Sequence, residues 1–585
     1  MNKTNTVSAI CLIALIVITA TTGCDKQKQQ VKNISSYEYD RGWEKLSIRE
    51  KIGQLVCFSY NKGIITQYGD GAIDTLLSRY PVGSVFLANW NMKPEVPSDS
   101  LGQHYQNTVQ QFSKSSKYPM LFVEDFETGI GSEIKGYTRT TSEMGMGATN
   151  SEEVAYSMGD IISMEARGIG INWLLHPIAD LNTNPSNFLT NVRAISDNEN
   201  IATRLLPWQV KAMQNNGVAA TAKHFPGDGT DFINQHFSTS TMHLSYEDWK
   251  QKHGKVFQML IDSGVAVIMA GHITFPAYQQ EKLNGEYLPA TLSKELMTDL
   301  LKKEMGFKGV VVSDALDMAG ISGYYENQLE TEIECFKAGA DILLWPRLEI
   351  IDSLEMRILR KEIPIERLND AVSRVWNLKK QLGLLDDNYS SIQPLSDKEL
   401  DENNKKAYQI AEKSVTLLDD KNKQLPLDTT KSKKLLIVSV SEKKGAEVFD
   451  IMKKELLKKG YEVEIRDDLS YFELGSGLDS LSAKYDKFIF TFFSNPGNPW
   501  GTLSLNNTKA LSMWTANKLP LNKVISIGFG DPYKNLIYMP RIWCRINCYQ
   551  TDDNTQLALV KGLTGEIEFT GKSPVKYNAP YYQGN

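Results

Sequence analysis

Eight short apolar runs, each ending in a turn or in polar residues, are the feature that most constrains the fold of this chain. Most of the intervals between them have a helical pattern, as at 153–167 and 293–305. Strands that are apolar on both faces and alternate with helices indicate a parallel sheet. Eight such units within residues 43–385 predict a (β/α)8 TIM-like barrel, with an open doubly wound sheet as the alternative. The runs are GQLVCF (53–58), GSVFLAN (83–89), MLFVED (120–125), INWLLHP (171–177), VAATAKH (218–224), VAVIMAGH (265–272), GVVVSDA (309–315) and ADILLWP (340–346).

A second alternating block occupies residues 434–573 and predicts a smaller α/β sandwich domain. It contains neither a glycine-rich dinucleotide fingerprint nor a phosphate-binding loop, so we expect no nucleotide cofactor. Residues 386–433 are expected to be a linker with a helix, and residues 574–585 a tail. The apolar runs of this block are LLIVSV (435–440), YEVEI (461–465), KFIFTFF (487–493) and KVISIGFG (523–530).

The amino-terminal residues differ from the rest of the chain. A basic residue precedes an apolar run (9–20), which is followed by TTGC (21–24). This order predicts a secretory signal over residues 1–23. A cysteine directly after small residues resembles a bacterial lipoprotein cleavage site, so we expect Cys24 to carry a lipid anchor and residues 24–42 to be a tether. The expected location is the bacterial cell envelope, at its periplasmic face or at the cell surface. Cleavage without lipid attachment is the alternative.

Composition and cysteine spacing exclude several classes of protein. The 585 residues include 64 Lys and Arg and 70 Asp and Glu, so the chain lacks the basic excess of a nucleic-acid-binding protein. The six cysteines show no zinc-like spacing, and we expect neither a metal nor another cofactor. Cys544 and Cys548 lie in a predicted strand, where positions four apart are too distant for a disulfide.

Ionisable residues stand where several of the apolar runs end. In a (β/α)8 barrel, catalytic residues lie at the carboxyl ends of the strands. Five of the eight predicted ends carry such residues, which favours an enzyme. The residues at these ends are Asp125 and Glu127, His176 and Asp180, Lys223 and His224, His272, and Ser313 with Asp314.

The stretch KHFPGDG (223–229), followed by NQH (234–236), resembles the loop after the fifth strand of glycoside hydrolase family 3, in its β-N-acetylglucosaminidase branch. GFKGVVVSDAL (306–316) is similar to the strand that carries the nucleophile in that family, and GINWLLHPIADLN (170–182) is similar to the region of its fourth strand. The resemblance covers about residues 43–430. It implies a carbohydrate substrate and a retaining exo-glycosidase that releases terminal β-linked N-acetylglucosamine from glycans or peptidoglycan fragments.

The resemblance also implies roles for individual residues. Retaining glycosidases use a nucleophilic carboxylate and an acid/base group on the other side of the glycosidic bond. Asp314 matches the nucleophile, although an aspartate here could instead cap the next helix. His236 matches the acid/base. Four residues match positions that hydrogen-bond the sugar nearest the nucleophile, with structural ion pairs as the alternative: Asp125, Arg193, Lys223 and His224.

Asn234 departs from the family pattern, which has an aspartate two residues before the acid/base histidine. An asparagine can orient the ring of His236 but supplies no charge, whereas a carboxylate would raise the pKa of the histidine. We therefore expect a lower pKa and activity that is reduced, shifted in pH or redirected, unless Asp228 or Asp231 replaces the missing partner. Two alternative functions follow: a β-N-acetylglucosaminide phosphorylase, because a neutral histidine repels phosphate less than a carboxylate does, and a catalytically impaired glycan-binding lipoprotein.

Overall fold

The computed structural model describes residues 41–441, 443–467, 469–494 and 507–576. Cys24, the predicted signal and nearly all of the predicted tether and tail lie outside these residues. Within the described ranges, no helix combines the length and the apolar character that a membrane crossing requires.

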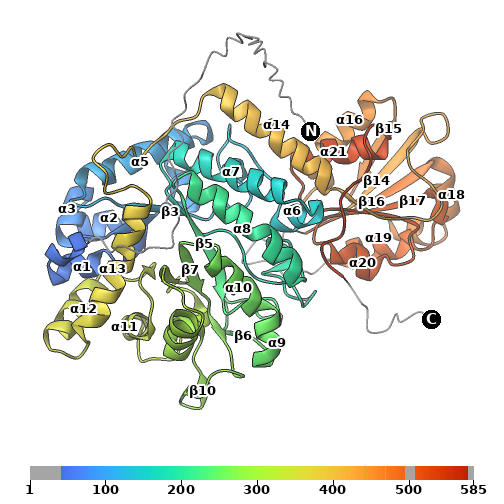
Figure 1. Ribbon diagram of the computed structural model, residues 1–585. Coiled ribbons are helices and arrows are strands. Elements are labelled where there is room, and N and C mark those ends of the chain that lie inside the picture. Colours follow the sequence, from blue (N-terminus) through green and yellow to red (C-terminus); the bar gives the residue numbers. More distant parts are fainter. Residues whose placement is uncertain (1–40, 442, 468, 495–506, 577–585) are drawn as a thin grey trace, which may run out of the picture. The chain divides into compact units, whose positions relative to one another are not determined.

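Eight parallel strands form a barrel, as the apolar runs predict (Figure 1). Their order is β11-β7-β5-β4-β3-β2-β1-β12, and a bridge between Val312 and Ile342 joins the two ends of this order. Every residue of these strands except Ser59 is buried, which explains why the runs are continuous rather than alternating. The strands are β1 (Val56–Ser59), β2 (Ser84–Phe86), β3 (Leu121–Glu124), β4 (Trp173–Leu174), β5 (Ala219–Phe225), β7 (Val267–Ala270), β11 (Val310–Ser313) and β12 (Leu343–Leu344).

Local sequence signals set the ends of the helices between these strands. Ser47 and Glu50 form a reciprocal capping box at the start of α1, and the Ser151 side chain accepts from the Val154 amide at the start of α7. Gly170 ends α7 at a φ of 93°, a conformation that favours glycine. The predicted helix at 293–305 is a π-helix over Glu295–Glu304. The α-helices of the barrel are α1 (Ile48–Gly53), α2 (Lys62–Gly69), α3 (Ile73–Arg79), α4 (Asn89–Met92), α5 (Leu101–Ser115), α6 (Glu143–Thr149), α7 (Glu152–Ile169), α8 (Glu199–Asn215), α9 (Tyr246–Gln251), α10 (His253–Asp262), α11 (Gln328–Ala338), α12 (Ile350–Leu359) and α13 (Ile365–Gln381).

The second domain is a six-stranded sheet with helices on both faces, as predicted. Its strand order is β13-β18-β17-β16-β14-β15, and only the β13–β18 pair is antiparallel. Leu435 and Ile437 of β14 pack with α16 and α21, while Leu436 and Val438 pack on the other face with α18 and α19. The strands are β13 (Thr416–Asp420), β14 (Lys434–Ser441), β15 (Glu462–Arg466), β16 (Lys487–Ser494), β17 (Val524–Gly530) and β18 (Cys544–Cys548). The helices are α14 (Asp397–Ser414), α15 (Gly445–Val448), α16 (Asp450–Lys458), α17 (Tyr471–Leu474), α18 (Leu478–Lys484), α19 (Asn507–Ala516), α20 (Tyr533–Tyr538) and α21 (Asp553–Leu563).

Two details refine the sequence analysis of this domain. The segment 386–433, predicted as a linker with a helix, contains α14 but also β13, which belongs to the sheet. Cys544 and Cys548 are buried free thiols in β18, so the prediction that they form no disulfide is confirmed.

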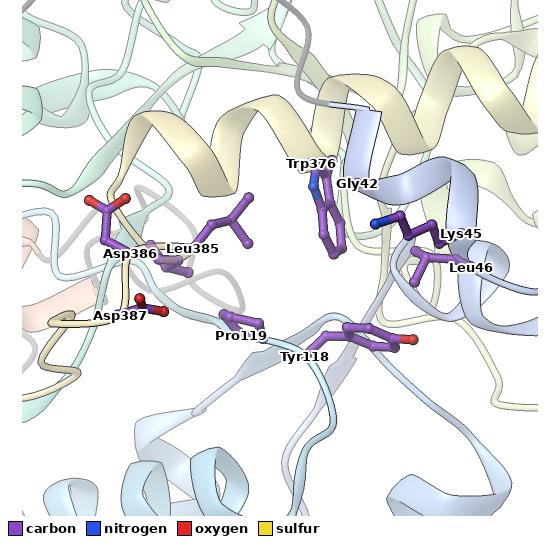
Figure 2. Close-up of a pocket in the computed structure, with 10 residues that line it drawn as sticks. Gly42, Lys45, Leu46, Tyr118, Pro119, Trp376, Leu385, Asp386 and Asp387 are labelled. Carbon is purple, nitrogen blue, oxygen red and sulfur yellow. The ribbon is translucent and has the colours of Figure 1, made fainter.

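A cavity of about 510 Å³ opens at the amino-terminal end of the barrel (Figure 2). It is lined in part by Tyr118 and Pro119, which precede β3, and by Trp376 of α13. Beside it the buried Lys379 ammonium donates to Gln54 Oε1 (2.6 Å) and to the carbonyls of Gly83 and Pro119 (3.2 and 2.6 Å), and burial lowers its pKa to about 7. None of the predicted site residues lines this cavity.

Candidate active site

The predicted site residues gather at the carboxyl end of the barrel, as expected for this fold. Asp125 follows β3, and Asp314 follows β11. Lys223 and His224 lie near the carboxyl end of β5. Arg193 ends a short 3-10 helix (Asn191–Arg193) after β4, and His236 lies on the loop after β5. Within the described ranges, no group of three or more His, Cys, Asp or Glu side chains is arranged to hold a metal ion.

Four charged side chains form one cluster on the β3, β4 and β5 side of this end. The buried Lys223 ammonium lies 2.8 Å from Asp125 Oδ1 and 3.1 Å from Glu127 Oε1. Arg193 binds Glu127 through two parallel hydrogen bonds of 2.8 Å. The Asp125 side chain is the most exposed of the four, at 39%. The cluster therefore offers a substrate one accessible carboxylate, Asp125, which is held by Lys223, and Glu127 in turn holds Lys223 and Arg193.

Glu127 is the member of this cluster to which sequence analysis gave no role. Burial acts to raise its pKa, but Arg193 and Lys223 outweigh burial and hold the pKa well below the usual range. Glu127 thus stays ionised and fixes both cations. The sequence does give one sign of this role, because Glu127 lies two residues after Asp125 at the end of the same strand.

The carboxylate of Asp180 orients His224. Asp180 Oδ2 lies 2.7 Å from His224 Nδ1, and Oδ1 accepts from the backbone amides of His224 (3.0 Å) and Asp228 (2.7 Å). Because Nδ1 is used in this way, Nε2 is the ring nitrogen that His224 offers to a ligand.

Asp314 stands at the end of β11 with 8% of its surface exposed. Its amide donates to the Ala270 carbonyl of the neighbouring strand (2.9 Å), and its Oδ1 accepts from the Ala315 amide (2.8 Å). The side chain does not cap the next α-helix, because α11 begins at Gln328 and is capped by Asn327. The alternative reading of Asp314 as a helix cap is therefore wrong.

The electrostatic surroundings keep Asp314 ionised. Burial acts to raise its pKa, but the histidines His224, His272 and His236 and the hydrogen bond from Ala315 lower it, and the net pKa lies below the usual value. A nucleophilic carboxylate must be ionised before it can attack. The environment of Asp314 meets that requirement at neutral pH.

His236 is joined both to Asn234 and to the loop of Asp314. Its Nδ1 lies 2.8 Å from Asn234 Oδ1, which also accepts from the His236 amide (3.0 Å). The His236 carbonyl accepts from the amide of Ala319, five residues after Asp314 (3.2 Å). Burial lowers the pKa of His236 to about 4, although Asp314 acts to raise it. Asn234 thus orients the ring without adding charge.

The other carboxylates of this loop hold its backbone in place. Asp231 accepts from the Ser240 hydroxyl (3.0 Å) and from the Thr241 amide (2.8 Å). Asp228 accepts from the side chains of Asn187 (3.0 Å) and Gln235 (2.6 Å). Burial and the nearby Asp180 raise the pKa of Asp228 to about 7. These contacts give both residues a structural role, so the idea that they replace the missing partner of His236 gains no support.

Gln235 is a residue that sequence analysis did not find. It is fully buried, donates from Nε2 to Asp228 Oδ2 (2.6 Å) and accepts at Oε1 from the His272 amide (2.6 Å). It therefore ties the residue before His236 to the end of β7. No sequence signal other than its position beside His236 indicates this role.

The sequence matches the family model described as "Glycosyl hydrolase family 3 N terminal domain" over residues 47–378. The chain belongs to glycoside hydrolase family 3. It is 28% identical over 543 residues to the "Beta-N-acetylglucosaminidase/beta-glucosidase" of Cellulomonas fimi, an alignment that covers 90% of this chain and 93% of that relative. It is 33% identical over 336 residues to the "Beta-hexosaminidase A" of Pseudoalteromonas piscicida, covering 53% of this chain and 55% of that relative.

Solved structures of the family share the two-domain fold. A "Beta-glucoside phosphorylase BglX" superposes with a TM-score of 0.80 at 27% identity, covering 92% of this chain and 95% of that one. A glycoside hydrolase family 3 β-N-acetylglucosaminidase from Paenibacillus sp. str. FPU-7 superposes with a TM-score of 0.74 at 26% identity, covering 91% and 99%. Together with the family model, these matches identify this member of glycoside hydrolase family 3 as a glycosidase.

We predict that Asn234→Asp moves the alkaline limb of the kcat/KM pH profile to higher pH. A general acid must be protonated, and with a pKa of about 4 the acidic form of His236 is scarce at neutral pH. A carboxylate beside Nδ1 favours the imidazolium and raises that pKa. The rate near neutrality should rise, within the ~10²–10⁴-fold that general acid catalysis supplies.

The pH profile is measured with a nitrophenyl β-N-acetylglucosaminide and with a disaccharide whose leaving group is poor. Asn234→Ala is the matched control, because it removes the hydrogen bond to His236 without adding charge. An identical alkaline limb in the wild type and in Asn234→Asp would show that His236 is not the acid.

Proposed function

We propose that this glycosidase is a retaining exo-enzyme that releases terminal β-linked N-acetylglucosamine from glycans or peptidoglycan fragments. The observation that carries the proposal is the pairing of an ionised carboxylate, Asp314, with a partly buried histidine, His236, on two loops that the Ala319 amide joins. Relatives whose names include β-N-acetylglucosaminidase and β-hexosaminidase support the substrate class.

In the first step the terminal sugar is bound and its anomeric carbon is attacked. Asp125 accepts hydrogen bonds from sugar hydroxyls, and His224 contacts them through Nε2. An Asp314 oxygen forms an ester bond to the anomeric carbon while the bond to the leaving oxygen breaks. His236 donates its Nε2 proton to that oxygen, because Nδ1 is directed to Asn234.

In the second step the ester is hydrolysed. Neutral His236 accepts a proton at Nε2 from a water molecule, whose oxygen attacks the anomeric carbon from the face that the leaving group vacated. The bond to Asp314 breaks and its carboxylate is restored, so two inversions give net retention. The low pKa of His236 suits this base-catalysed step and slows the first step, which needs the protonated ring.

A second candidate function is phosphorolysis, because the structure that superposes with a TM-score of 0.80 is that of a β-glucoside phosphorylase. Phosphate carries its own negative charge and needs no general base to attack the sugar ester. A histidine in the acid/base position is neutral when phosphate arrives, whereas a carboxylate would repel it.

Product analysis with and without inorganic phosphate tests these functions. Hydrolysis of a nitrophenyl β-N-acetylglucosaminide should give free β-configured N-acetylglucosamine at early times, at a rate that phosphate does not change. An anomeric sugar phosphate that forms only with phosphate present would instead establish the phosphorylase. Saturable binding of the sugar with no product in either buffer would establish the impaired glycan-binding protein. The matching β-glucoside serves as the comparison substrate.

We predict that Asp314 is the residue that forms the covalent intermediate. A ring-fluorinated N-acetylglucosaminyl fluoride slows the second step, so the ester should accumulate. Peptide mass mapping should then place one sugar on the peptide that contains Asp314, and Asp314→Asn should abolish that label. A label on another carboxylate would refute the assignment, and release of the α-anomer from an ordinary substrate would refute the retaining mechanism.

We also propose that the mature protein is a lipoprotein of the cell envelope that begins at Cys24, on the basis of the sequence TTGC (21–24) after an apolar run. Metabolic labelling with a fatty acid should mark the protein, and Cys24→Ala should remove the mark. Cys11→Ala is the matched control, because Cys11 lies in the segment removed with the signal. Labelling that survives Cys24→Ala would contradict the proposal.

A further inference from the structure

A cavity of about 500 Å³ lies at the carboxyl end of the barrel and is lined in part by the loop that carries His236. Three loops line it: the loop after β5, the loop after β7 and the loop after β11. The loop after β7 contains the hairpin of β9 (Lys282–Leu283) and β10 (Glu286–Tyr287), which Figure 1 shows at the edge of the barrel. The lining residues are Ser238, Thr239, Thr241, Thr274, Pro276, Leu283, Asn284, Glu286, Tyr287, Ser322, Gly323 and Tyr324.

The walls of this cavity are fixed to one another by hydrogen bonds. The short strands β6 (Ser240–Thr241) and β8 (Ile273–Thr274) pair in parallel, and this pairing joins the loop after β5 to the loop after β7. The Thr239 hydroxyl donates to the Gly320 carbonyl (2.7 Å) and lies 3.0 Å from the Tyr324 hydroxyl, which joins the loop after β5 to the loop after β11. The cavity is therefore formed before a ligand arrives.

The position of the cavity relative to the reacting groups matches that of a leaving group. Ser238 and Thr239 come two and three residues after His236 in the loop, and Tyr324 belongs to the loop that begins at Asp314. In the strand order, β5 separates β7 and β11 from β4 and β3, and the charged cluster lies on the side of β4 and β3. A leaving group must depart on the side of its proton donor, so its remaining atoms extend toward these loops.

The chemistry of the lining favours a hydroxylated and uncharged ligand. Seven of the lining residues carry hydroxyl groups, and the one acidic side chain, Glu286, is exposed. Among the described residues that line the cavity there is no lysine, arginine or histidine. Lys282 contacts the ring of Tyr287 at 4.2 Å but is not itself a lining residue. A ligand that carries a carboxylate or a phosphate would thus meet a like charge and no cation in the wall.

We propose that this cavity is the leaving-group subsite and that Glu286 makes it select a neutral or amine-bearing sugar over a sugar that carries a carboxylate. The inference rests on the proposed exo-glycosidase function and narrows its substrate class. Hydroxyl groups of the wall exchange hydrogen bonds with the leaving sugar. The Glu286 carboxylate repels an acidic substituent on that sugar and attracts an ammonium group.

The test compares kcat/KM for two disaccharides that share the terminal sugar. N,N′-diacetylchitobiose has a neutral leaving sugar, and β-N-acetylglucosaminyl-N-acetylmuramic acid has a leaving sugar with a carboxylate. The wild type should prefer the first. Glu286→Gln should lower the ratio of the two kcat/KM values by about 2–5-fold, the size expected for an exposed charge pair. Glu286→Lys should lower this ratio further or invert it. Added salt should also lower this ratio for the wild type, because salt screens the repulsion between exposed charges.

Glu281→Gln is the matched control, because Glu281 is an exposed carboxylate next to the same hairpin that does not line the cavity. It should leave the preference unchanged. If the disaccharides are hydrolysed but neither Glu286 variant changes the preference, the subsite assignment is wrong. If neither disaccharide nor the nitrophenyl glycoside is turned over, the proposed function itself fails, so the two failures are distinguishable.

Discussion

The hydrogen bonds of one buried carboxylate, Asp180, connect His224 at the end of β5 with the loop that carries His236. Asp180 orients the ring of His224 and holds the Asp228 amide, which fixes the turn at the end of β5. Asp228 in turn accepts from Gln235, and Gln235 accepts from the His272 amide at the end of β7. The residue after Gln235 is His236. The buried side chain of Asp180 therefore helps to determine where the loop of His236 lies, because the links in this chain are hydrogen bonds between buried groups.

Burial gives the two central groups protonation states that serve different steps. Asp314 remains ionised, because three histidines and a backbone amide outweigh the cost of burial. His236 is neutral at physiological pH, because burial outweighs the nearby carboxylate and Asn234 contributes no charge. Enzymes usually divide acid and base work by separating the pKa values of two groups. Here both groups are deprotonated at rest, so His236 must gain a proton before it can act as an acid.

The sequence predicts the barrel and the residues at its strand ends well, because buried parallel strands produce continuous apolar runs that end at the site. It does not predict β13, since four of the five residues of that edge strand are only partly buried and two of them are aspartates. It does not predict the role of Gln235 either. That role depends on the His272 amide, which is distant in sequence and close only in the folded barrel.

In the proposed mechanism, the loop after β5 serves both protonation and recognition of the leaving group. His236 and the cavity residues Ser238 and Thr239 are neighbours in the loop after β5, and the Thr239 hydroxyl is bonded to the Gly320 carbonyl of the Asp314 loop. A leaving sugar that presses on this wall therefore acts on the backbone that positions the histidine. The Ala319 amide transmits the same constraint from the nucleophile side. Specificity for the leaving group and the geometry of proton transfer are thus set by the same few hydrogen bonds, since interactions that orient reacting groups also determine the rate.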